Sequence, residues 1–287
     1  MAPSPRSVAA RSGPFERLAR DRTHGAYPLA RTALVALGRA TSKVERVDPR
    51  VLRRWASAVR RAQPALGTVV GIAEGLEELA RAGPGRRTPG QMRGWIAARR
   101  RRLAREEREV LRRARRAFPP GAAVVTLSAS SLVARLLGGF RAERRPSRVI
   151  VLASRPGGEG VSLARTLQRR QVPTRLIPDR EGPRAVRGTT VLLVGADTIY
   201  ADGSLLHKVG TRRMAEAAFR ANVPVVSLSG SSKFLRRRPP RRLPGGGWFD
   251  LTPPRWVSAY WTERGALRPD QVGARLGGLS PDRRRTR

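Results

Sequence analysis

The sequence predicts an α/β protein, with a helical N-terminal domain and a C-terminal domain built on a mostly parallel β-sheet. Two observations indicate this fold class. In residues 24–118, apolar side chains recur at the three- and four-residue spacing of amphipathic helices. After Pro119-Pro120-Gly121, short apolar runs alternate with longer helical stretches, a pattern typical of βαβ units.

The two ends of the chain fall outside both patterns. Residues 1–23 carry proline, serine, glycine and arginine without a period, so we expect a disordered basic arm there. Residues 24–118 are expected to form the helical domain and residues 119–272 the α/β domain. Residues 273–287 are expected to be a disordered tail.

The helical domain contains apolar stripes at helical spacing, and two of them begin with a clear start signal. The stripes lie in residues 24–47, 49–62, 66–79 and 89–118. Asp48-Pro49 supplies an N-cap and a proline at the first helical position of the second stripe. Thr88-Pro89-Gly90-Gln91 is a capping-box pattern that opens the long last helix.

In the α/β domain, expected strands and helices alternate. The expected strands lie in residues 123–127, 149–153, 174–178, 191–194 and 223–228. The expected helices lie in residues 130–137, 159–170 and 206–221. Because the strands of βαβ units are parallel, the loops that follow them gather at one edge of the sheet, where such proteins bind ligands.

The chain is strongly basic, since 59 lysine and arginine residues against 21 acidic ones give a formal net charge of +38. Such a charge favours binding to nucleic acid or another polyanion. Only three of these 59 residues are lysine, however, and arginine beside many alanine, glycine and proline residues is also typical of a GC-rich genome. The long helix has an arginine-rich face, which includes residues 99–102. This face likewise either contacts RNA or is exposed to solvent.

Several classes of protein are excluded by composition. The absence of cysteine excludes disulfides, thiolate nucleophiles and cysteine-ligated metals. With only His24 and His207, a histidine-based metal site is not expected, and neither is a cofactor. No apolar run approaches the roughly 18 residues that span a membrane, and the N-terminus lacks the apolar segment of a secretory signal. We therefore expect a cytoplasmic protein without a membrane partner.

Four polar loops are expected at the carboxyl edge of the sheet, and we call them the strand-end loops. They comprise residues 128–131, 154–160, 195–197 and 229–233. Serine hydroxyls, Arg155, Lys208 and Lys233 would surround one acid, Asp197, which suits a phosphorylated polyol. The alternative interpretation of each loop is a structural turn or a helix cap.

The stretch around Asp197 also carries a family pattern. Gly195-Ala196-Asp197-Thr198-Ile199, Asp202-Gly203 and Lys208-Val209-Gly210-Thr211 resemble the signature GAD-x-I…(N/D)G…NK-(I/V)-GT of the initiation factor 2B-related family. That family includes the α, β and δ subunits of eukaryotic translation initiation factor 2B, methylthioribose-1-phosphate isomerase and ribose-1,5-bisphosphate isomerase. Residues 61–67, 154–160, 249–250 and 262–265 are similar to further motifs of the family. The resemblance implies a Rossmann-like C-terminal domain of the NagB/RpiA/CoA-transferase type and a homodimer formed through it.

The resemblance further implies roles for single residues. In the isomerases of the family, a cysteine works with the aspartate matched by Asp197 to move a proton or hydride between C1 and C2. Here Ser128 stands in place of that cysteine, so Asp197 and Ser128 are the candidate catalytic residues. The candidate substrate-binding residues are Arg61, Arg155, Glu159, Gly160, His207, Lys208 and Lys233. Glu159 and His207 replace a glutamine and an asparagine of the isomerases, and an unassisted serine is a poor acid–base group.

These departures favour a protein similar to the translation-factor subunits, with a pocket for a phosphorylated sugar or a nucleotide and a regulatory or weakly catalytic role. The alternative is an aldose–ketose isomerase acting on a sugar 1-phosphate of the ribose 1,5-bisphosphate or methylthioribose 1-phosphate type. A second alternative is a nonspecific polyanion- or RNA-binding protein that acts through its charge.

Overall fold

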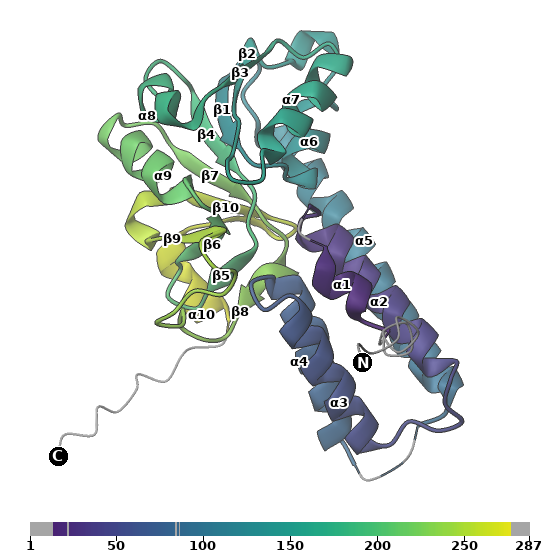
Figure 1. Ribbon diagram of the computed structural model, residues 1–287. Coiled ribbons are helices and arrows are strands. Elements are labelled where there is room, and N and C mark those ends of the chain that lie inside the picture. The colour runs from purple at the N-terminus through teal and green to yellow at the C-terminus, as the bar shows by residue number, and fades with distance from the viewer. Residues whose placement is uncertain (1–13, 22, 84, 86, 277–287) are drawn as a thin grey trace, which may run out of the picture. The chain divides into compact units, whose positions relative to one another are not determined.

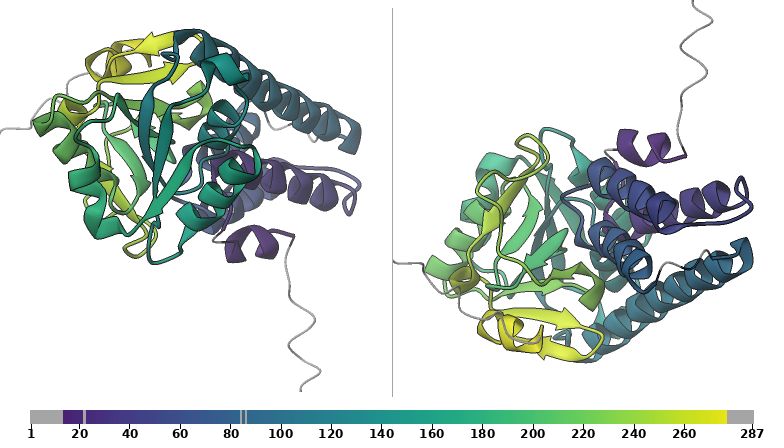
Figure 2. Two further views of the ribbon diagram at one scale, coloured as in Figure 1. Left: turned by 90° about the horizontal axis from the view of Figure 1, so that it is seen from above. Right: turned by 90° about the horizontal axis from the view of Figure 1, so that it is seen from below.

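The computed structural model describes residues 14–21, 23–83, 85 and 87–276, which form two compact units (Figure 1, Figure 2). The first unit is helical and comprises the residues up to Pro64 together with Val69–Arg102. The second is an α/β unit and comprises Ala65–Thr68 and the residues from Leu103 onward. A helical N-terminal region followed by a mostly parallel sheet confirms the predicted fold class.

The helical unit is built from amphipathic helices whose apolar stripes are buried. The helices are α1 (Glu16–Arg20), α2 (Ala26–Thr41), α3 (Pro49–Ala62), α4 (Gly67–Arg81) and α5 (Pro89–Ala117). The start of α4, up to Thr68, and the part of α5 from Leu103 onward belong to the α/β unit. As predicted, Asp48 caps α3, because its Oδ1 accepts from the Val51 N–H at 2.8 Å. The capping box of α5 is formed as well, since the Thr88 N–H donates to Gln91 Oε1 at 2.9 Å and the Gln91 N–H donates to Thr88 Oγ1 at 3.2 Å.

No helix in the described part of the chain combines the length and the apolar character needed to cross a membrane. The longest one here, α5, spans 29 residues but carries arginine along most of its exposed side.

The predicted disordered arm is wrong for its last residues, because residues 14–21 are placed and partly buried. Phe15 and Leu18 are buried. The side chain of Gln63 donates from Nε2 to the carbonyls of Leu18 at 2.7 Å and Asp21 at 2.9 Å. These bonds satisfy carbonyls at the end of α1 that a helix of five residues cannot pair by itself. Residues 1–13 and 277–287 lie outside the described residues, so the disorder expected there stays a prediction.

The α/β unit is built on a seven-stranded sheet in the order β11-β10-β7-β4-β1-β2-β3. The strands are β1 (Ala123–Leu127), β2 (Arg148–Leu152), β3 (Thr174–Ile177), β4 (Val191–Val194), β7 (Val225–Leu228), β10 (Ala259–Thr262) and β11 (Gly265–Leu267). Neighbouring strands are parallel except β11, which is antiparallel to β10. Strands β4 and β7 are buried at every position, as expected for central parallel strands covered on both faces.

Helices cover both faces of this sheet, as Figure 1 shows. Helices α6 (Ser131–Leu137) and α7 (Glu159–Arg169) lie on one face, and α8 (Gly182–Ala185) and α9 (Thr211–Arg220) lie on the other. Short 3-10 helices occur at Ala142–Arg144, Asp179–Glu181, Ser231–Lys233, Pro254–Trp256 and Pro269–Gln271. The described chain ends with α10 (Val272–Arg275), so the tail predicted to be disordered from residue 273 is helical at its start, next to the buried Val272.

A second sheet of four strands was not predicted. Its order is β8 (Phe234–Leu235), β5 (Thr198–Tyr200), β6 (Leu205–Lys208) and β9 (Phe249–Thr252). The helix expected over residues 206–221 is therefore wrong at its start, because residues 205–208 are strand and α9 begins at Thr211. Leu205 and Leu206 are both fully buried, and two adjacent apolar residues are compatible with a buried strand as well as with a helix.

Gly160 lies where the start of α7 packs against the end of β2. A Cβ at this position would lie 1.7 Å from the carbonyl oxygen of Leu152, a backbone atom held in the sheet. We expect Gly160→Ala to lower the free energy of unfolding by about 3 kcal/mol, because it overpacks a rigid contact. Chemical denaturation followed by circular dichroism measures this change.

Gly94→Ala is the matched control, since Gly94 is exposed within α5 and a Cβ there meets no atom within 4 Å. It should raise stability by up to about 1 kcal/mol, because alanine is the better helix former. Wild-type stability of Gly160→Ala would contradict the close packing of α7 against β2.

Candidate functional site

The strand-end loops lie at the carboxyl ends of neighbouring parallel strands. They follow β1, β2, β4 and β7, which are adjacent in the sheet. Strands β1 to β3 proceed in one direction across the sheet and β4, β7 and β10 in the other, so the strand order reverses between β1 and β4. In open α/β sheets, the crevice at such a reversal is the usual ligand site.

The loops after β1 and β2 are tied together. Ser128 has a left-handed backbone, with a φ of 64°, and its N–H donates to Ser154 Oγ at 2.7 Å. Ser130 caps α6 by accepting from the Val133 N–H at 3.4 Å. The hydroxyl of Ser128 itself has no hydrogen-bond partner within the described residues.

The loop after β2 is fixed by a carboxylate that the sequence analysis missed. Asp179 accepts from the backbone N–H groups of Ser154 and Arg155 at 2.7 and 2.8 Å. Its position just after an expected strand was the available signal, because β3 is the neighbour of β2. The side chain of Arg155 is exposed and makes no hydrogen bond or ion pair to the described part of the chain, so it can reach a ligand.

Asp197 lies in the loop after β4. Its carbonyl accepts from the Gly67 N–H at 2.9 Å. The residue keeps some exposed surface, yet the loss of water around the carboxyl raises its pKa to about 6. The cations Lys233 and Lys208 oppose this shift, whereas the negative charge of Glu159 adds to it.

Lys208 lies on β6 instead of in a helix, and its charge is already compensated. Its Nζ is 2.8 Å from Glu159 Oε1, and the two side chains are only 5% and 16% exposed. The ammonium also lies 4.2 Å from the centre of the Trp248 ring, a cation–π contact that the sequence analysis missed. The second carboxylate oxygen, Glu159 Oε2, is buried and has no hydrogen-bond partner in the described residues. Lys208 and Glu159 thus form a covered ion pair.

Lys233 lies in the 3-10 helix after β7 and is buried. Its ammonium donates to the Ala196 carbonyl at 2.5 Å. Burial lowers the pKa of Lys233, and the carboxylates of Asp197, Glu106 and Glu107 raise it. This lysine therefore connects the loops that follow β4 and β7.

Glu106 and Glu107, in the part of α5 that belongs to the α/β unit, were also missed. Glu106 accepts from Ser231 Oγ at 3.3 Å, from the Ser232 N–H at 3.1 Å and from Ser232 Oγ at 2.5 Å. Glu107 pairs with Arg135 at 2.7 Å. The sequence carried a signal for both, because they interrupt the arginine-rich segment of the helix. In the structure both are buried, where a carboxylate needs partners.

His207 is a buried base on β6. Burial and the charges of Lys233 and Lys208 lower its pKa to about 3, so the imidazole is neutral at physiological pH. Its Nδ1 lies 3.0 Å from Thr211 Oγ1, at the start of α9.

The other predicted binding residues have identifiable structural contacts. Gly160 packs its backbone against β2, and Arg61, on α3 of the helical unit, donates to Ser57 Oγ. Their roles toward a ligand stay predictions. Among the residues that the structure describes, no group of three or more histidine, cysteine, aspartate or glutamate side chains could hold a metal ion.

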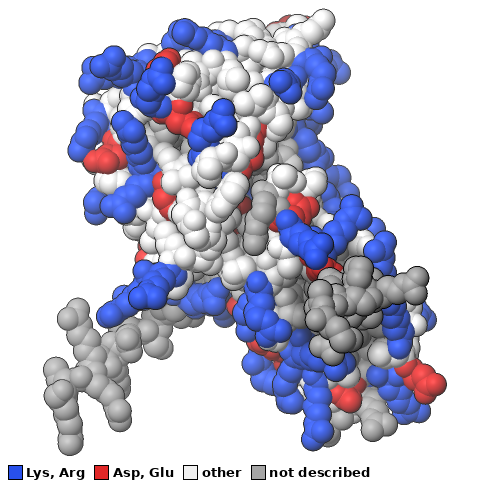
Figure 3. Space-filling model, in the orientation of Figure 1, with Lys and Arg blue, Asp and Glu red and all other residues white. Residues whose placement is uncertain are grey.

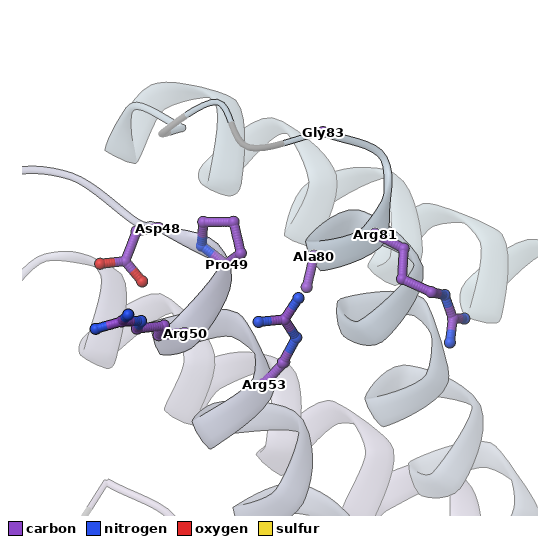
Figure 4. A pocket seen from close by; sticks show the side chains of 7 residues that line it. All are labelled: Asp48, Pro49, Arg50, Arg53, Ala80, Arg81 and Gly83. Carbon is purple, nitrogen blue, oxygen red and sulfur yellow. The ribbon is translucent and has the colours of Figure 1, made fainter.

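Two open pockets each have three arginines in their lining. The first, of about 670 Å³, lies in the helical unit between the start of α3 and the end of α4, with Arg53 between the two helices (Figure 4). Its lining residues are Asp48, Pro49, Arg50, Arg53, Ala80, Arg81 and Gly83. The second, of about 520 Å³, lies in the α/β unit and is lined by Arg112, Arg113, Ala114, Arg116, Ala117, Trp261, Thr262, Gly265 and Ala266. The arginines of both pockets are exposed, so these pockets specify a ligand less closely than the strand-end loops do.

Sequence comparison finds relatives of two kinds. A family model described as the initiation factor 2 subunit family matches residues 24–242. A Pyrococcus furiosus protein described as translation initiation factor eIF-2B subunit 2-like is 29% identical over 162 residues, which cover 52% of this chain and 59% of that protein. A ribose 1,5-bisphosphate isomerase of Haloferax volcanii is 29% identical over 150 residues, which cover 43% of this chain and 46% of that enzyme. The chain thus spans about half the length of the curated relatives it matches.

Solved structures share the fold. The crystal structure of translation initiation factor eIF-2B from Pyrococcus horikoshii OT3 gives a TM-score of 0.77 at 23% identity, covering 90% of this chain and 96% of that chain. A chain of the tetrameric eIF2B-beta2-delta2 complex from C. thermophilum gives 0.74 at 20% identity, covering 92% of each. At such low identity these likenesses establish the fold.

The raised pKa of Asp197 makes stability depend on pH in a defined direction. The folded state keeps the proton up to about pH 6, whereas the ordinary pKa of the group is 3.8. The free energy of unfolding therefore falls as the pH rises from about 4 to 6, and asparagine at this position removes the loss. We therefore compare the free energy of unfolding of Asp197→Asn with that of the wild type at pH 4 and at pH 7. The difference should change by about 1–3 kcal/mol in favour of the variant as the pH rises, at about 1.36 kcal/mol per pKa unit.

Urea denaturation at the two pH values measures this difference. Burial also raises the pKa of Asp250 to about 6, but Asp250 is present in both proteins and its effect cancels. Asp270→Asn, at an exposed position, controls for the loss of one carboxylate. A difference between Asp197→Asn and the wild type that does not change with pH would contradict the raised pKa.

Proposed function

Because the chain belongs to the initiation factor 2 subunit family, we propose that it binds a phosphorylated sugar or a nucleotide and has a regulatory or weakly catalytic role. The proposed site lies at the carboxyl ends of β1 and β4, where the strand order reverses. The observation that carries the proposal is the Asp197 carboxyl, whose pKa is raised to about 6 beside two buried lysines. Carboxyls perturbed in this way cluster at functional sites.

The protonation of Asp197 suits a ligand that carries hydroxyl groups. A carboxyl with a pKa of about 6 changes between its charged and neutral forms near physiological pH. The charged form accepts a hydrogen bond and the neutral form can also donate one, so Asp197 can pair with a sugar hydroxyl in either state.

The other groups at the site support binding better than efficient turnover. Proton transfer between neighbouring carbon atoms needs a second acid–base group besides Asp197. Ser128 is the candidate, but no described residue forms a hydrogen bond with its hydroxyl, and a hydroxyl without a base is a poor proton carrier. His207, with a pKa of about 3, is too weak a base to activate a hydroxyl near neutral pH.

The alternative, an aldose–ketose isomerase, is supported by relatives that are ribose 1,5-bisphosphate isomerases. Two of them are 29% and 31% identical to this chain over 150 and 155 residues. In that case Asp197 would be the acid–base group, and Ser128 would replace a thiol at a cost in rate.

Arg155 is the group we propose for the phosphate. Lys208 is paired with Glu159, and Lys233 donates to the Ala196 carbonyl. The exposed guanidinium of Arg155 has no such partner in the described chain and can bind a phosphate with two parallel hydrogen bonds.

A polyanion partner is less well supported. On the face that Figure 3 shows, basic side chains are spread over many elements of each unit and interspersed with acidic ones, instead of forming one stripe. Such a spread fits an arginine-rich composition, although nonspecific binding to nucleic acid at low salt is expected from the charge. We also propose a homodimer through the α/β unit, which membership of the family implies.

Ligand binding is tested by thermal-shift titration with ribose 1,5-bisphosphate and methylthioribose 1-phosphate. At least one should raise the melting temperature of the wild type, because a ligand that binds only the folded state stabilises it. Arg155→Ala should weaken binding about tenfold or more, since a hydrogen bond to a charged group is worth about 1.5–3 kcal/mol. Arg165→Ala removes another exposed arginine, on α7, and should bind as the wild type does.

Product formation is followed in the same samples by NMR. Fast turnover that is lost in Asp197→Asn would favour the isomerase over the regulatory protein. No thermal shift with either compound would contradict the proposed ligand class.

A further inference from the structure

His207 has one ring nitrogen that the protein leaves without a partner. The residue is only 4% exposed. Its Nδ1 lies 3.0 Å from Thr211 Oγ1, but no described residue forms a hydrogen bond with Nε2. Unlike the fully enclosed Glu159 Oε2, this nitrogen keeps a little accessible surface, so it is a candidate contact for a ligand.

The hydrogen bonds of Thr211 determine which nitrogen carries the proton. The Thr211 hydroxyl donates its single proton to the carbonyl oxygen of Lys208, at 2.6 Å. Toward His207 the same hydroxyl oxygen can only accept, so Nδ1 carries the proton and donates it. In the neutral ring, Nε2 then bears a lone pair and is an acceptor.

The surroundings of the ring keep it in this neutral form. Burial disfavours the charged ring most, and the charges of Lys233 and Lys208 act in the same direction, so the pKa of His207 is lowered to about 3. At physiological pH, Nε2 therefore accepts hydrogen bonds without taking up a proton.

Nε2 faces the first residue of the loop after β4, Gly195. A Cβ on Gly195 would lie 3.3 Å from His207 Nε2 and 2.7 Å from Ser130 Oγ. The imidazole and the Ser130 hydroxyl therefore both pack closely against Gly195, where a Cβ would collide with Ser130. The three residues come from β6 and from the loops after β1 and β4, where the strand order reverses.

We propose that His207 is a specificity-determining residue of this site, with Nε2 accepting a hydrogen bond from a hydroxyl group of the bound sugar next to the Ser130 hydroxyl. The inference rests on the proposed function, because it requires a sugar ligand between β1 and β4.

A neutral acceptor selects the ligand by its donors. A sugar hydroxyl can donate to Nε2, whereas a carbonyl, an ether oxygen or a fully ionised phosphate oxygen can only accept and is rejected. Discrimination of this kind is strong, since an analogue without the donor leaves a desolvated acceptor unpaired.

The tautomer is tested on ligand-free protein by nitrogen-15 NMR of the histidine side chains. The chain has two histidines, so His24→Gln assigns the spectrum by removing one ring. We expect the His207 ring to be neutral and protonated at Nδ1 from pH 5 to pH 8. A proton on Nε2, or titration of the ring in this range, would overturn the inference.

Ligand recognition is tested with ribose 1,5-bisphosphate as the probe. At saturation, the Nε2 resonance of His207 should move in the direction of a hydrogen-bonded acceptor while the His24 signals stay in place. His207→Phe keeps an aromatic ring without an acceptor and should weaken binding about tenfold. His207→Gln can present a carbonyl oxygen near the position of Nε2 and should recover part of the affinity. Melting temperatures of both variants report whether they fold.

The outcomes separate this inference from the proposed function. If the wild type binds the probe and a folded His207→Phe binds it equally well, the role of His207 is overturned and the proposed function stands. If the wild type binds only methylthioribose 1-phosphate, that compound replaces the probe; if it binds neither compound, both are overturned. If His207→Phe does not fold, the Nε2 resonance of the wild type decides: a shift supports the contact, and an unchanged signal overturns it.

Discussion

The ion pair between Lys208 and Glu159 is the interaction on which the candidate site depends. It joins β6 of the second sheet to the start of α7, across 49 positions of the sequence, and it is covered by Trp248. Both partners also act on the neighbouring acid. Burial is the main cause of the raised pKa of Asp197, while the charge of Lys208 lowers this pKa and the charge of Glu159 raises it. A contact that supports the fold therefore also contributes to the protonation of the proposed ligand-binding carboxyl.

The same division of charge extends across the strand-end loops. Lys233 donates to the Ala196 carbonyl, and His207 is kept neutral by burial and by its cationic neighbours. The interior of the proposed site thus offers hydroxyls, a carboxyl and a neutral imidazole, while Arg155 places a positive charge at the exposed edge. This arrangement fits a ligand with an uncharged polar body and an anionic end, which is the chemistry of a phosphorylated sugar.

Where local signals and tertiary structure agreed, the sequence was sufficient to predict the element. The apolar runs of β1 and β4 and the capping box of α5 are examples, because each allows one structure. The β5–β6 hairpin could not be predicted, since Leu205-Leu206 is compatible with a helix and with a buried strand. The loops of the site were predicted as a set, but their pairings were not. These pairings are contacts between distant parts of the chain, which the sequence does not reveal. Lys208 pairs with Glu159, while Asp179 and Glu106 fix the neighbouring loops.

Amide hydrogen exchange with and without ribose 1,5-bisphosphate tests the location of the site most directly. Binding between β1 and β4 predicts slower exchange in peptides that cover the strand-end loops, because a bound ligand suppresses local opening of their backbone. Exchange around Arg50 and Arg53, in the arginine-lined pocket of the helical unit, should not change. Slowing confined to that pocket, or no slowing in the strand-end loops at saturating ligand, would contradict a binding site at the reversal of strand order.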